Sequence, residues 1–254
     1  MNGLDIFSLA GRRALVTGAN TGIGQGIAIS LARAGAEILA VGRSSMDETI
    51  DAIEAHGGKV VPVMSDLSDS VGAAAALERS WDELGPIDIL VNNAGIIRRG
   101  DAVDFSEADW DDVMDVNLKS VFMLSQALAR KAFTEERPAK IINIASLLSF
   151  QGGIRIVSYT AAKSGLAGLT RILANEWAAR RINVNAIAPG YIITNNTKVL
   201  REDPVRSAEI LKRIPAGHWG KPEDIGGTAV FLASAASDYV HGAIFPVDGG
   251  WLAR

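Results

Sequence analysis

The sequence contains no cysteine, which excludes a disulfide framework and any chemistry that depends on a thiolate. Histidine is also scarce. The three histidines, His56, His218 and His241, lie far apart in the chain and lack the spacing typical of metal ligands. The sequence therefore predicts no metal site.

An excess of basic residues and long apolar segments are absent as well. The formal net charge of −4 gives no reason to expect nucleic acid or an anionic membrane as a partner. The first residues, MNGLDIFSLAGRR, lack a charged segment followed by an apolar one, and no uncharged apolar run reaches about 18 residues. We therefore expect a soluble cytoplasmic protein that binds neither nucleic acid nor a membrane.

Glycine and apolar residues are abundant: 26 residues are glycine, 8 are proline and 48% are hydrophobic. Short apolar, β-branched runs alternate with longer segments of helical character. The predicted strands are 13–17, 37–41, 59–64, 87–91, 140–145, 182–188 and 243–247, and the predicted helices are 22–34, 46–56, 70–84, 106–133, 158–179 and 222–233. Such alternation is typical of a parallel sheet covered on both faces. We expect an α/β fold, one doubly wound domain over residues 1–254 with a seven-stranded parallel sheet.

One segment interrupts this pattern. Residues 190–219 follow a predicted strand and are too many for an ordinary connection in a compact domain. Connections of this length are often substrate lids, which is our prediction here, and a plain surface excursion is the alternative.

A glycine-rich turn, TGANTGIG, follows the first predicted strand and leads directly into a helix. Glycines at such a turn let backbone N–H groups approach a pyrophosphate, and the helix N-terminus favours negative charge. The spacing of Gly18, Gly22 and Gly24 differs from the commoner G-x-G-x-x-G. Two later segments also follow predicted strands: SDLSD offers Asp66 and the Leu67 amide to an adenine ring, and NNAG offers small residues to a ribose. These segments predict a nucleotide site at one edge of the sheet.

The stretch SYTAAKS places Tyr159 and Lys163 four residues apart on a predicted helix. Residues at this spacing lie on one helix face, so their head groups can act together. A surface pair without any role is the alternative, and the pair alone does not decide between the two.

Taken together, these motifs resemble the short-chain dehydrogenase/reductase family. TGANTGIG, NNAG, the Asn in DVNLKS, a Ser thirteen residues before the Tyr, YTAAK and APG occur in the family's order and spacing over nearly the whole chain. The resemblance implies a Rossmann domain, an oxidoreductase, and catalytic roles for Asn117, Ser146, Tyr159 and Lys163. The predicted cofactor-binding residues are Gly18, Asn20, Thr21, Gly22, Ile23, Gly24, Arg43, Asp66, Leu67, Asn93, Ala94, Gly95, Tyr159, Lys163, Pro189, Gly190 and Ile192.

The chemistry of these side chains fits the implied roles. A tyrosine with an ordinary pKa of about 10 is a poor base at neutral pH, and a nearby ammonium or a cationic nicotinamide would stabilise its phenolate. Ser146 can hydrogen-bond the substrate oxygen on which charge develops. Asn117 would hold a water that links Lys163 to solvent, and an Asn bonded only to nearby backbone is the alternative. A non-catalytic nucleotide-binding module is the lesser alternative for the whole chain.

The end of the second predicted strand bears on the choice of cofactor. Gly42 stands where NAD-specific relatives usually carry an acidic residue, and Arg43 beside it can pair with a 2′-phosphate. The glycine turn, however, lacks the basic residue that many NADP-linked members have. The sequence favours NADP(H), with NAD(H) as the alternative.

Several further segments, including NNAGIIRR, ASLLSFQGGIR, NAIAPGY, RIPAGHWG and VDGGWLAR, resemble the family members that act on sugar acids such as 2-deoxy-D-gluconate or 2-dehydro-3-deoxy-D-gluconate. Those members are generally NAD-linked, so Gly42 and Arg43 are a departure. A guanidinium can grip a carboxylate through two hydrogen bonds. The predicted substrate residues are Arg98, Ser146, Gln151, Arg155, Tyr159, Asn195, Asn196 and Arg206. Reduction of 3-ketoacyl groups on acyl carrier protein, or oxidation of another polyol or gluconate, is the alternative, and each Arg alone is equally well explained by a surface ion pair.

Assembly is indicated only indirectly. Ala161, Ala162, Gly165 and Gly168 permit close approach of another helix, and the C-terminus carries Trp251 and Leu252. Packing within one chain explains both features equally well. The family resemblance implies a homotetramer.

Overall fold

Seven parallel strands form one sheet in the computed structural model, which describes residues 4–254. The strand order is β3-β2-β1-β4-β5-β6-β7, so the chain winds in one direction from β1 to β3 and in the other from β4 to β7. The strands are β1 Arg13–Thr17, β2 Glu37–Gly42, β3 Val60–Met64, β4 Ile89–Asn92, β5 Ala139–Ile144, β6 Ile182–Pro189 and β7 Ile244–Val247. The predicted doubly wound, seven-stranded parallel sheet is confirmed.

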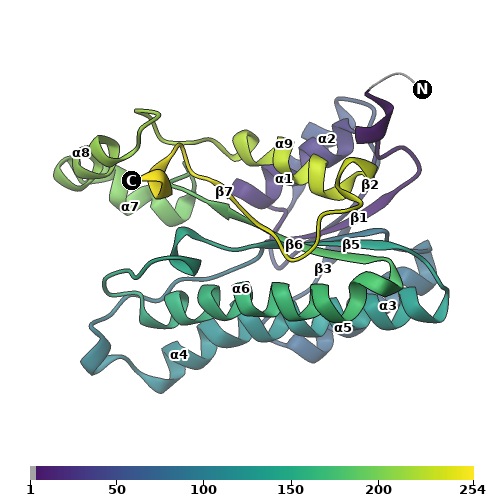
Figure 1. Cartoon of the computed structure of the whole chain (residues 1–254), viewed down its shortest axis with the longest axis horizontal. Coiled ribbons are helices and arrows are strands. Elements are labelled where there is room, and N and C mark those ends of the chain that lie inside the picture. Colours follow the sequence, from purple (N-terminus) through teal and green to yellow (C-terminus); the bar gives the residue numbers. More distant parts are fainter. Residues whose placement is uncertain (1–3) are drawn as a thin grey trace.

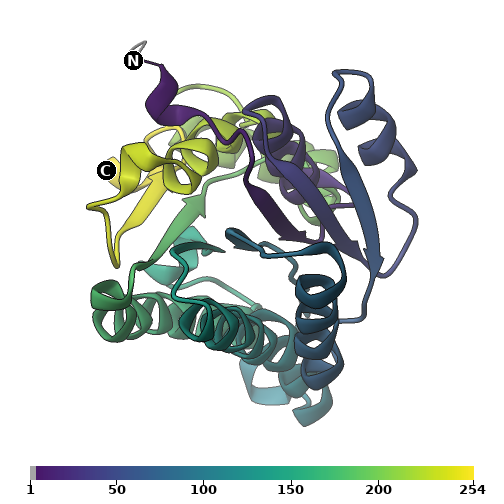
Figure 2. The same cartoon turned by 90° about the vertical axis from the view of Figure 1, so that its right-hand side faces the viewer.

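Helices cover both faces of this sheet (Figures 1 and 2). One layer contains α1 Gly22–Arg33, α2 Asp47–Glu54 and α9 Pro222–Ala233, and the other contains α3 Ser70–Leu84, α4 Glu107–Met114, α5 Ser120–Thr134 and α6 Val157–Trp177. Two short helices, α7 Lys198–Glu202 and α8 Pro204–Arg213, lie beside the C-terminus at one end of the molecule. No helix between residues 4 and 254 has both the length and the apolar composition needed to cross a lipid bilayer.

The two helical layers explain why the strands consist of nearly continuous apolar residues. Successive side chains of a strand point to opposite faces. In β1, Leu15 packs into the core beneath α3, α5 and α6, whereas Ala14 and Val16 pack into the core beneath α1, α2 and α9. Because both faces of this strand are buried, each alternate set contributes apolar residues to a core.

Three predicted elements have the observed bounds, namely 13–17, 70–84 and 222–233, and most others differ at one or both ends by one or two residues. The helix predicted over 106–133 is wrong as one element. It consists of α4, a π-helical turn at Asp115–Lys119, and α5. The π turn contains Asn117, whose side chain is held by a distant loop. This contact explains a break that local propensity does not signal.

Candidate active site

The turn between β1 and α1 has the backbone that an anion site requires. Gly18 and Gly22 have φ values of +64° and +58°, in the left-handed region that favours glycine. A Cβ at Gly24 would lie 2.2 Å from the Gly18 carbonyl oxygen, so only glycine fits there. Helix α1 begins at Gly22, so its free N–H groups face this turn. The turn therefore fits a pyrophosphate group.

Hydrogen bonds fasten this turn to the end of β4. The Thr17 hydroxyl accepts from the backbone N–H groups of Asn93, at 2.9 Å, and Ala94, at 3.1 Å. The Asn93 side-chain amide donates to the Thr17 carbonyl at 2.9 Å. Strands β1 and β4 are the pair at which the winding direction changes, and open α/β sheets bind ligands at that point. The NNAG segment is thus part of the frame of the site as well as part of its lining.

A cavity of about 870 Å³ extends from this edge of the sheet to the segment 190–219. It brings together most of the predicted site residues. Those that line it are Gly18, Asn20, Thr21, Gly22, Ile23, Arg43, Asp66, Leu67, Asn93, Ala94, Gly95, Ser146, Gln151, Tyr159, Lys163, Pro189, Gly190, Ile192, Asn195, Asn196 and Arg206. Four predicted residues are not among the lining: Gly24, Arg98, Asn117 and Arg155.

At one end of the cavity, the loops after β2 and β3 carry polar groups. The Asp66 side chain accepts hydrogen bonds from the backbone N–H and the hydroxyl of Ser68, and these bonds, with the Arg43 charge nearby, lower the pKa of Asp66. The Asn20 amide donates to the Ser44 hydroxyl at 2.9 Å. The exposed Arg43 and Ser44 are therefore the groups that β2 offers to a ligand, and no carboxylate follows this strand directly.

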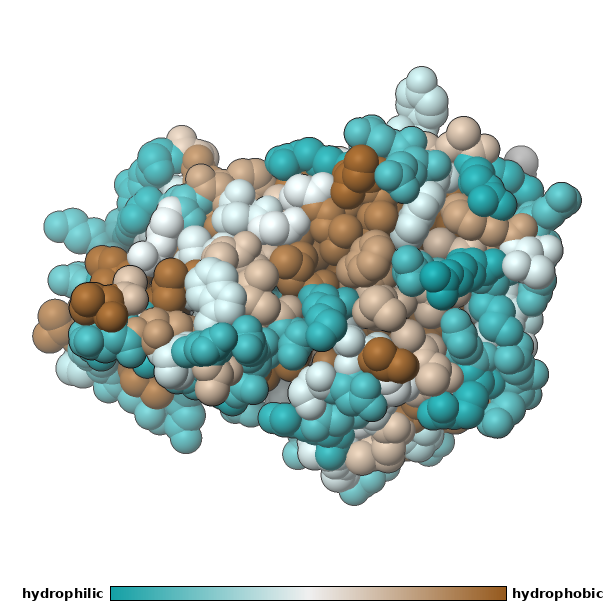
Figure 3. Space-filling view, turned by 90° about the horizontal axis from the view of Figure 1, so that it is seen from below, coloured by the Kyte–Doolittle hydropathy of each residue, from teal (hydrophilic) through white to brown (hydrophobic). Residues whose placement is uncertain are grey.

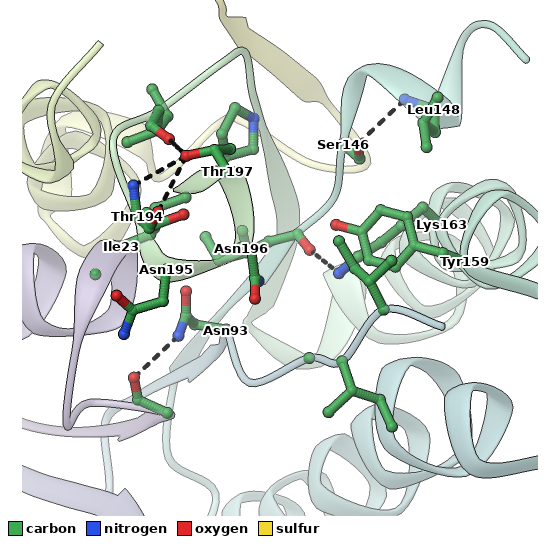
Figure 4. Close-up of a pocket in the computed structure, with 18 of the residues that line it drawn as sticks. Ile23, Asn93, Ser146, Leu148, Tyr159, Lys163, Thr194, Asn195, Asn196 and Thr197 are labelled. Atoms are coloured by element: carbon green, nitrogen blue, oxygen red, sulfur yellow. Dashed lines mark hydrogen bonds between the residues drawn. The ribbon is translucent and has the colours of Figure 1, made fainter. Parts of the chain in front are cut away.

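Tyr159 and Lys163 extend from α6 into the middle of the cavity, across from Asn195 and Asn196 (Figure 4). The Lys163 ammonium is buried, donates to the Ile144 carbonyl at 2.6 Å, and lies 5.6 Å from the centre of the Tyr159 ring. Burial lowers the pKa of Lys163 to about 8. Burial also raises the pKa of Tyr159, and a hydrogen bond with Ser146 and the Arg99 charge oppose that rise. The Lys163 ammonium thus donates its hydrogen bond to the main chain, and Ser146 and Arg99 are the groups that stabilise the Tyr159 phenolate.

Ser146 follows β5 and stands at the start of a short 3₁₀ turn, Leu147–Ser149. Its hydroxyl oxygen accepts from the backbone N–H of Leu148 at 3.2 Å. A serine hydroxyl has one proton to donate. The contact with Leu148 uses the oxygen as acceptor, so the proton serves the hydrogen bond with Tyr159 and can turn from there to a substrate oxygen in the cavity.

Asn117 lies behind the cavity wall and is fully buried. Its Oδ1 accepts from the Ile96 N–H at 2.9 Å, and its Nδ2 donates to the Ile96 carbonyl at 2.8 Å. A Cβ at Gly95 would lie 2.6 Å from the Asn117 Oδ1, so the bend beside it requires glycine. Both ends of the amide are thus engaged with a loop distant in sequence. The side chain braces the chain after NNAG, an arrangement that neither predicted alternative described.

Two of the three predicted arginines point elsewhere. Arg98 pairs with Asp109 at 3.3 Å and with Asp112 at 3.0 Å. Arg155 pairs with Asp101 at 3.2 Å, and its φ of +60° is unusual for a residue with a side chain. Both form the surface ion pairs that the sequence left open as an alternative.

Besides Arg43 at the end of β2, the arginines that reach the cavity are Arg99, Arg206 and Arg213. Arg99 donates to the Asn196 carbonyl at 3.4 Å, and its charge favours the phenolates of Tyr159 and Tyr191. Arg206 also pairs with Glu209 at 3.0 Å. Arg99 and Arg213 are not among the residues predicted from the sequence. Arg213 stands seven residues after Arg206, two turns along one helix face, which is a signal that the sequence does contain. Nothing in the sequence distinguishes Arg99 from Arg98.

Within residues 4–254, no group of three or more His, Asp or Glu side chains is arranged to hold a metal ion.

Comparison with known proteins agrees with this geometry. A family model described as Enoyl-(Acyl carrier protein) reductase matches residues 18–252. The 2-dehydro-3-deoxy-D-gluconate 5-dehydrogenase of Dickeya dadantii is 59% identical over 251 residues, which cover 99% of both chains. The chain belongs to the short-chain dehydrogenase/reductase family.

Solved structures of other members of the short-chain dehydrogenase/reductase family have the same fold. A proposed 2-deoxy-D-gluconate 3-dehydrogenase of Agrobacterium tumefaciens with bound NADP is 61% identical and has a TM-score of 0.95. The match covers 98% of the present chain and 100% of that structure's chain. A gluconate 5-dehydrogenase of Burkholderia cenocepacia in complex with NADP and tartrate is 39% identical and has a TM-score of 0.94. This match covers the full length of both chains.

The catalytic roles that this family implies for individual residues stay predictions. The structure places three of the four residues, Ser146, Tyr159 and Lys163, on the cavity, and it places Asn117 behind the cavity wall. In this dehydrogenase/reductase, the side chains for which the family implies catalytic roles therefore lie in or directly behind one cavity.

We expect Lys163→Met to stabilise the cofactor-free protein while abolishing turnover. Lowering the pKa of Lys163 from 10.5 to about 8 corresponds to about 3 kcal/mol of unfavourable ammonium burial, partly offset by the bond to Ile144. The variant's free energy of unfolding at pH 7 should exceed the wild type's by about 1–3 kcal/mol. Urea titration measures this difference.

The pH dependence provides the control. Between pH 8 and 10.5 the unfolded wild type binds more protons than the folded one, so wild-type stability rises with pH and the difference shrinks. Lys119→Met, at an exposed ion pair, should show no such trend. A difference between Lys163→Met and wild type that is equal at pH 7 and pH 10 would contradict this account.

Proposed function

We propose that the chain is an NADP-linked dehydrogenase that interconverts a secondary alcohol and a ketone on a sugar acid such as 2-dehydro-3-deoxy-D-gluconate or 2-deoxy-D-gluconate. The observation that carries the proposal is the convergence of Arg99, Arg206 and Arg213 on the cavity that also contains Tyr159. Guanidinium groups bind carboxylates strongly and in a fixed orientation. The names of the relatives, including one structure with NADP and tartrate bound, support the same substrate class.

The proposed mechanism assigns a separate task to each side chain. When bound, NADP(H) supplies or accepts the hydride. Tyr159 takes the alcohol proton during oxidation and returns it during reduction. Ser146, whose hydroxyl oxygen accepts from Leu148, turns its proton from Tyr159 to the substrate oxygen. Lys163 keeps a positive charge near the phenolate, and Asn117 positions the chain beside the cavity.

The cofactor residues are those that line the glycine turn and the ends of β2, β3 and β4. For the 2′-phosphate we propose Arg43, because it is exposed at the end of β2, no carboxylate directly follows that strand, and the nearby Asp66 side chain is bonded to Ser68. Relatives with NADP bound support this choice. Comparing kcat/KM for NADP and NAD, in the wild type and in Arg43→Ala, tests it, and a strong NAD preference in both would refute it.

We also propose that residues 1–254 work as one catalytic domain, with 190–219 as its lid. The segment contributes Asn195, Asn196 and Arg206 to the cavity. Its first turn is fixed, since the Thr197 hydroxyl donates to the Ile192 carbonyl at 2.7 Å. The substrate would meet Tyr159 from α6 on one side and this segment on the other. A cytoplasmic location is part of the proposal, since substrate and cofactor must both be supplied in solution, and cell fractionation tests it.

For assembly, we propose a homotetramer. Apolar side chains gather in the middle of the face that α4, α5 and α6 form (Figure 3). They line a shallow groove and include Met114, Leu118, Phe122, Leu169 and Ile172. Gly165 and Gly168 of α6 are exposed, whereas Ala162 and Trp251 are buried within the chain. The charged residues of this groove, Asp115 and Lys119, pair with each other, so its otherwise apolar lining fits the same helices of a second copy.

Light scattering at micromolar concentration should give a mass four times that of one chain. Ile172→Glu, which places a charge on this face, should lower the mass while leaving the circular dichroism spectrum unchanged. A mass equal to that of one chain for the wild type would refute the tetramer.

We expect Tyr159→Phe to bind NADPH as the wild type does and to lose turnover by about 10²- to 10⁴-fold, because it lacks only the proton-transferring oxygen. Fluorescence titration and steady-state assays with 2-deoxygluconate, keto-deoxygluconates, gluconate, uncharged polyols and acetoacetyl thioesters measure both properties. The proposed function fails if Tyr159→Phe stays near the wild-type rate, or if thioesters or polyols outperform every sugar acid.

Arg99 and Arg98 form a natural pair for testing acid recognition. Arg99→Ala should raise the KM for the sugar acid by about 10- to 100-fold, because it removes a guanidinium from the cavity. Arg98→Ala breaks only ion pairs at the surface and should change that KM by less than about twofold. Equal effects of the two substitutions would show that Arg99 has no particular role in binding the acid.

A further inference from the structure

Gln151 lies between two groups that can only donate hydrogen bonds. Its Oε1 is 3.4 Å from the Arg213 Nη2 and 3.4 Å from the Trp251 Nε1. Neither a guanidinium nor an indole N–H can accept a hydrogen bond, so both must face the amide oxygen. This fixes which end of the amide is which. The NH2 group of Gln151 must point away from Arg213 and Trp251, and Gln151 lines the cavity.

The two donors are themselves held in place. Trp251 is 4% exposed, with the Arg213 guanidinium 4.0 Å above its ring and the Tyr191 ring 4.7 Å away. Arg254 donates to the backbone carbonyls of Lys212 at 2.7 Å and of Arg213 at 3.3 Å. These are free carbonyls at the end of α8, where a cation is favoured. The short C-terminal turn Trp251–Ala253 is thus tied to the last turn of α8.

Gln151, Arg213 and Trp251 come from three distant parts of the chain and form one wall of the cavity. With the amide oxygen occupied, this wall offers a ligand hydrogen-bond donors from Gln151 and Arg213. A carboxylate has only acceptor sites and bonds to such a wall without leaving a donor opposed to a donor. A terminal hydroxyl forms weaker, uncharged hydrogen bonds there.

We propose that Trp251 and Arg213 are positioning residues that hold Gln151 as an obligate hydrogen-bond donor to the substrate carboxylate, so that the C-terminal turn sets the preference for acids over polyols. This inference rests on the proposed function, since it needs a sugar acid in the cavity. Beyond that function, the inference names the side chains that fix the Gln151 amide, Arg213 and Trp251, and the C-terminal turn that carries Trp251.

Trp251→Phe keeps an aromatic ring beneath Arg213 and removes the indole donor. The KM for the sugar acid should rise by about three- to tenfold, the loss expected for one orienting hydrogen bond, with kcat and the KM for NADP within about twofold of wild type. Trp219→Phe is the matched control. The Trp219 ring lies 5.4 Å from the Tyr191 ring, centre to centre, but Trp219 neither lines the cavity nor bonds to Gln151. The KM of Trp219→Phe for the sugar acid should therefore equal that of the wild type. Equal effects of the two substitutions overturn the proposal.

Gln151→Glu gives a second measurement with a sharper sign. The new carboxylate still accepts from Arg213 and Trp251 but presents a negative oxygen where the NH2 group was. The KM for the sugar acid should rise by about tenfold or more, while kcat/KM for a matched uncharged polyol falls by less than about twofold. An unchanged ratio of acid to polyol activity overturns the proposal even if the variant is stable and active.

The same assays distinguish failure of this inference from failure of the proposed function. If the wild type prefers sugar acids and the variants keep that preference, only the role of the C-terminal turn is wrong. If the wild type prefers thioesters or polyols, the proposed function is wrong and the inference falls with it.

Discussion

The site depends on the hydrogen bonds that join the ends of β1 and β4 through Thr17 and Asn93. These strands are the pair at which the sheet changes winding direction, so no covalent connection of short length holds their loops together. Side chains therefore make the connection. The Thr17 hydroxyl and the Asn93 amide keep the glycine turn beside the NNAG bend. Asn117 extends the same bracing one step further by holding Ile96 from behind.

This bracing allows the cavity to hold groups whose burial is unfavourable. Lys163 and Tyr159 are both desolvated. Burial lowers the pKa of Lys163 and raises that of Tyr159, so it favours the neutral form of each. Packing of α6 against the sheet keeps them in place, since Ala162, Leu166 and Ala167 on the same helix are buried. The packing of this helix thus offsets the cost of burying Lys163 and of partly burying Tyr159. The low local dielectric also strengthens the electrostatic interaction of Tyr159 with nearby charges, including that of Arg99.

The sequence predicted the sheet well because its inner strands are buried on both faces and all its strands are short apolar runs between helices. It also predicted most of the cavity, since residues after parallel strands share one edge. It did not predict the break at Asp115–Lys119, because Asn117 bonds to Ile96, a contact twenty-one residues away in sequence that leaves no local signal. Arg98 and Arg99 show the second limit. They are neighbours in a loop without periodicity, and which one faces the cavity depends on where Asp109, Asp112 and the lid lie.

The π turn has a consequence for how this region can change in evolution. A π turn places one more residue in a helical turn than an α-helix does, so it acts as a one-residue insertion between α4 and α5. Deleting a residue there would restore regular α-helical bonding. Because the wider turn absorbs the extra residue, the side chains of α4 and α5 would keep their faces, whereas the residues of the turn itself, Asn117 among them, would shift. Asn117 would then lose its register with Ile96, so single-residue gaps should be strongly disfavoured between 115 and 119, although the exposed loops nearby can vary in length.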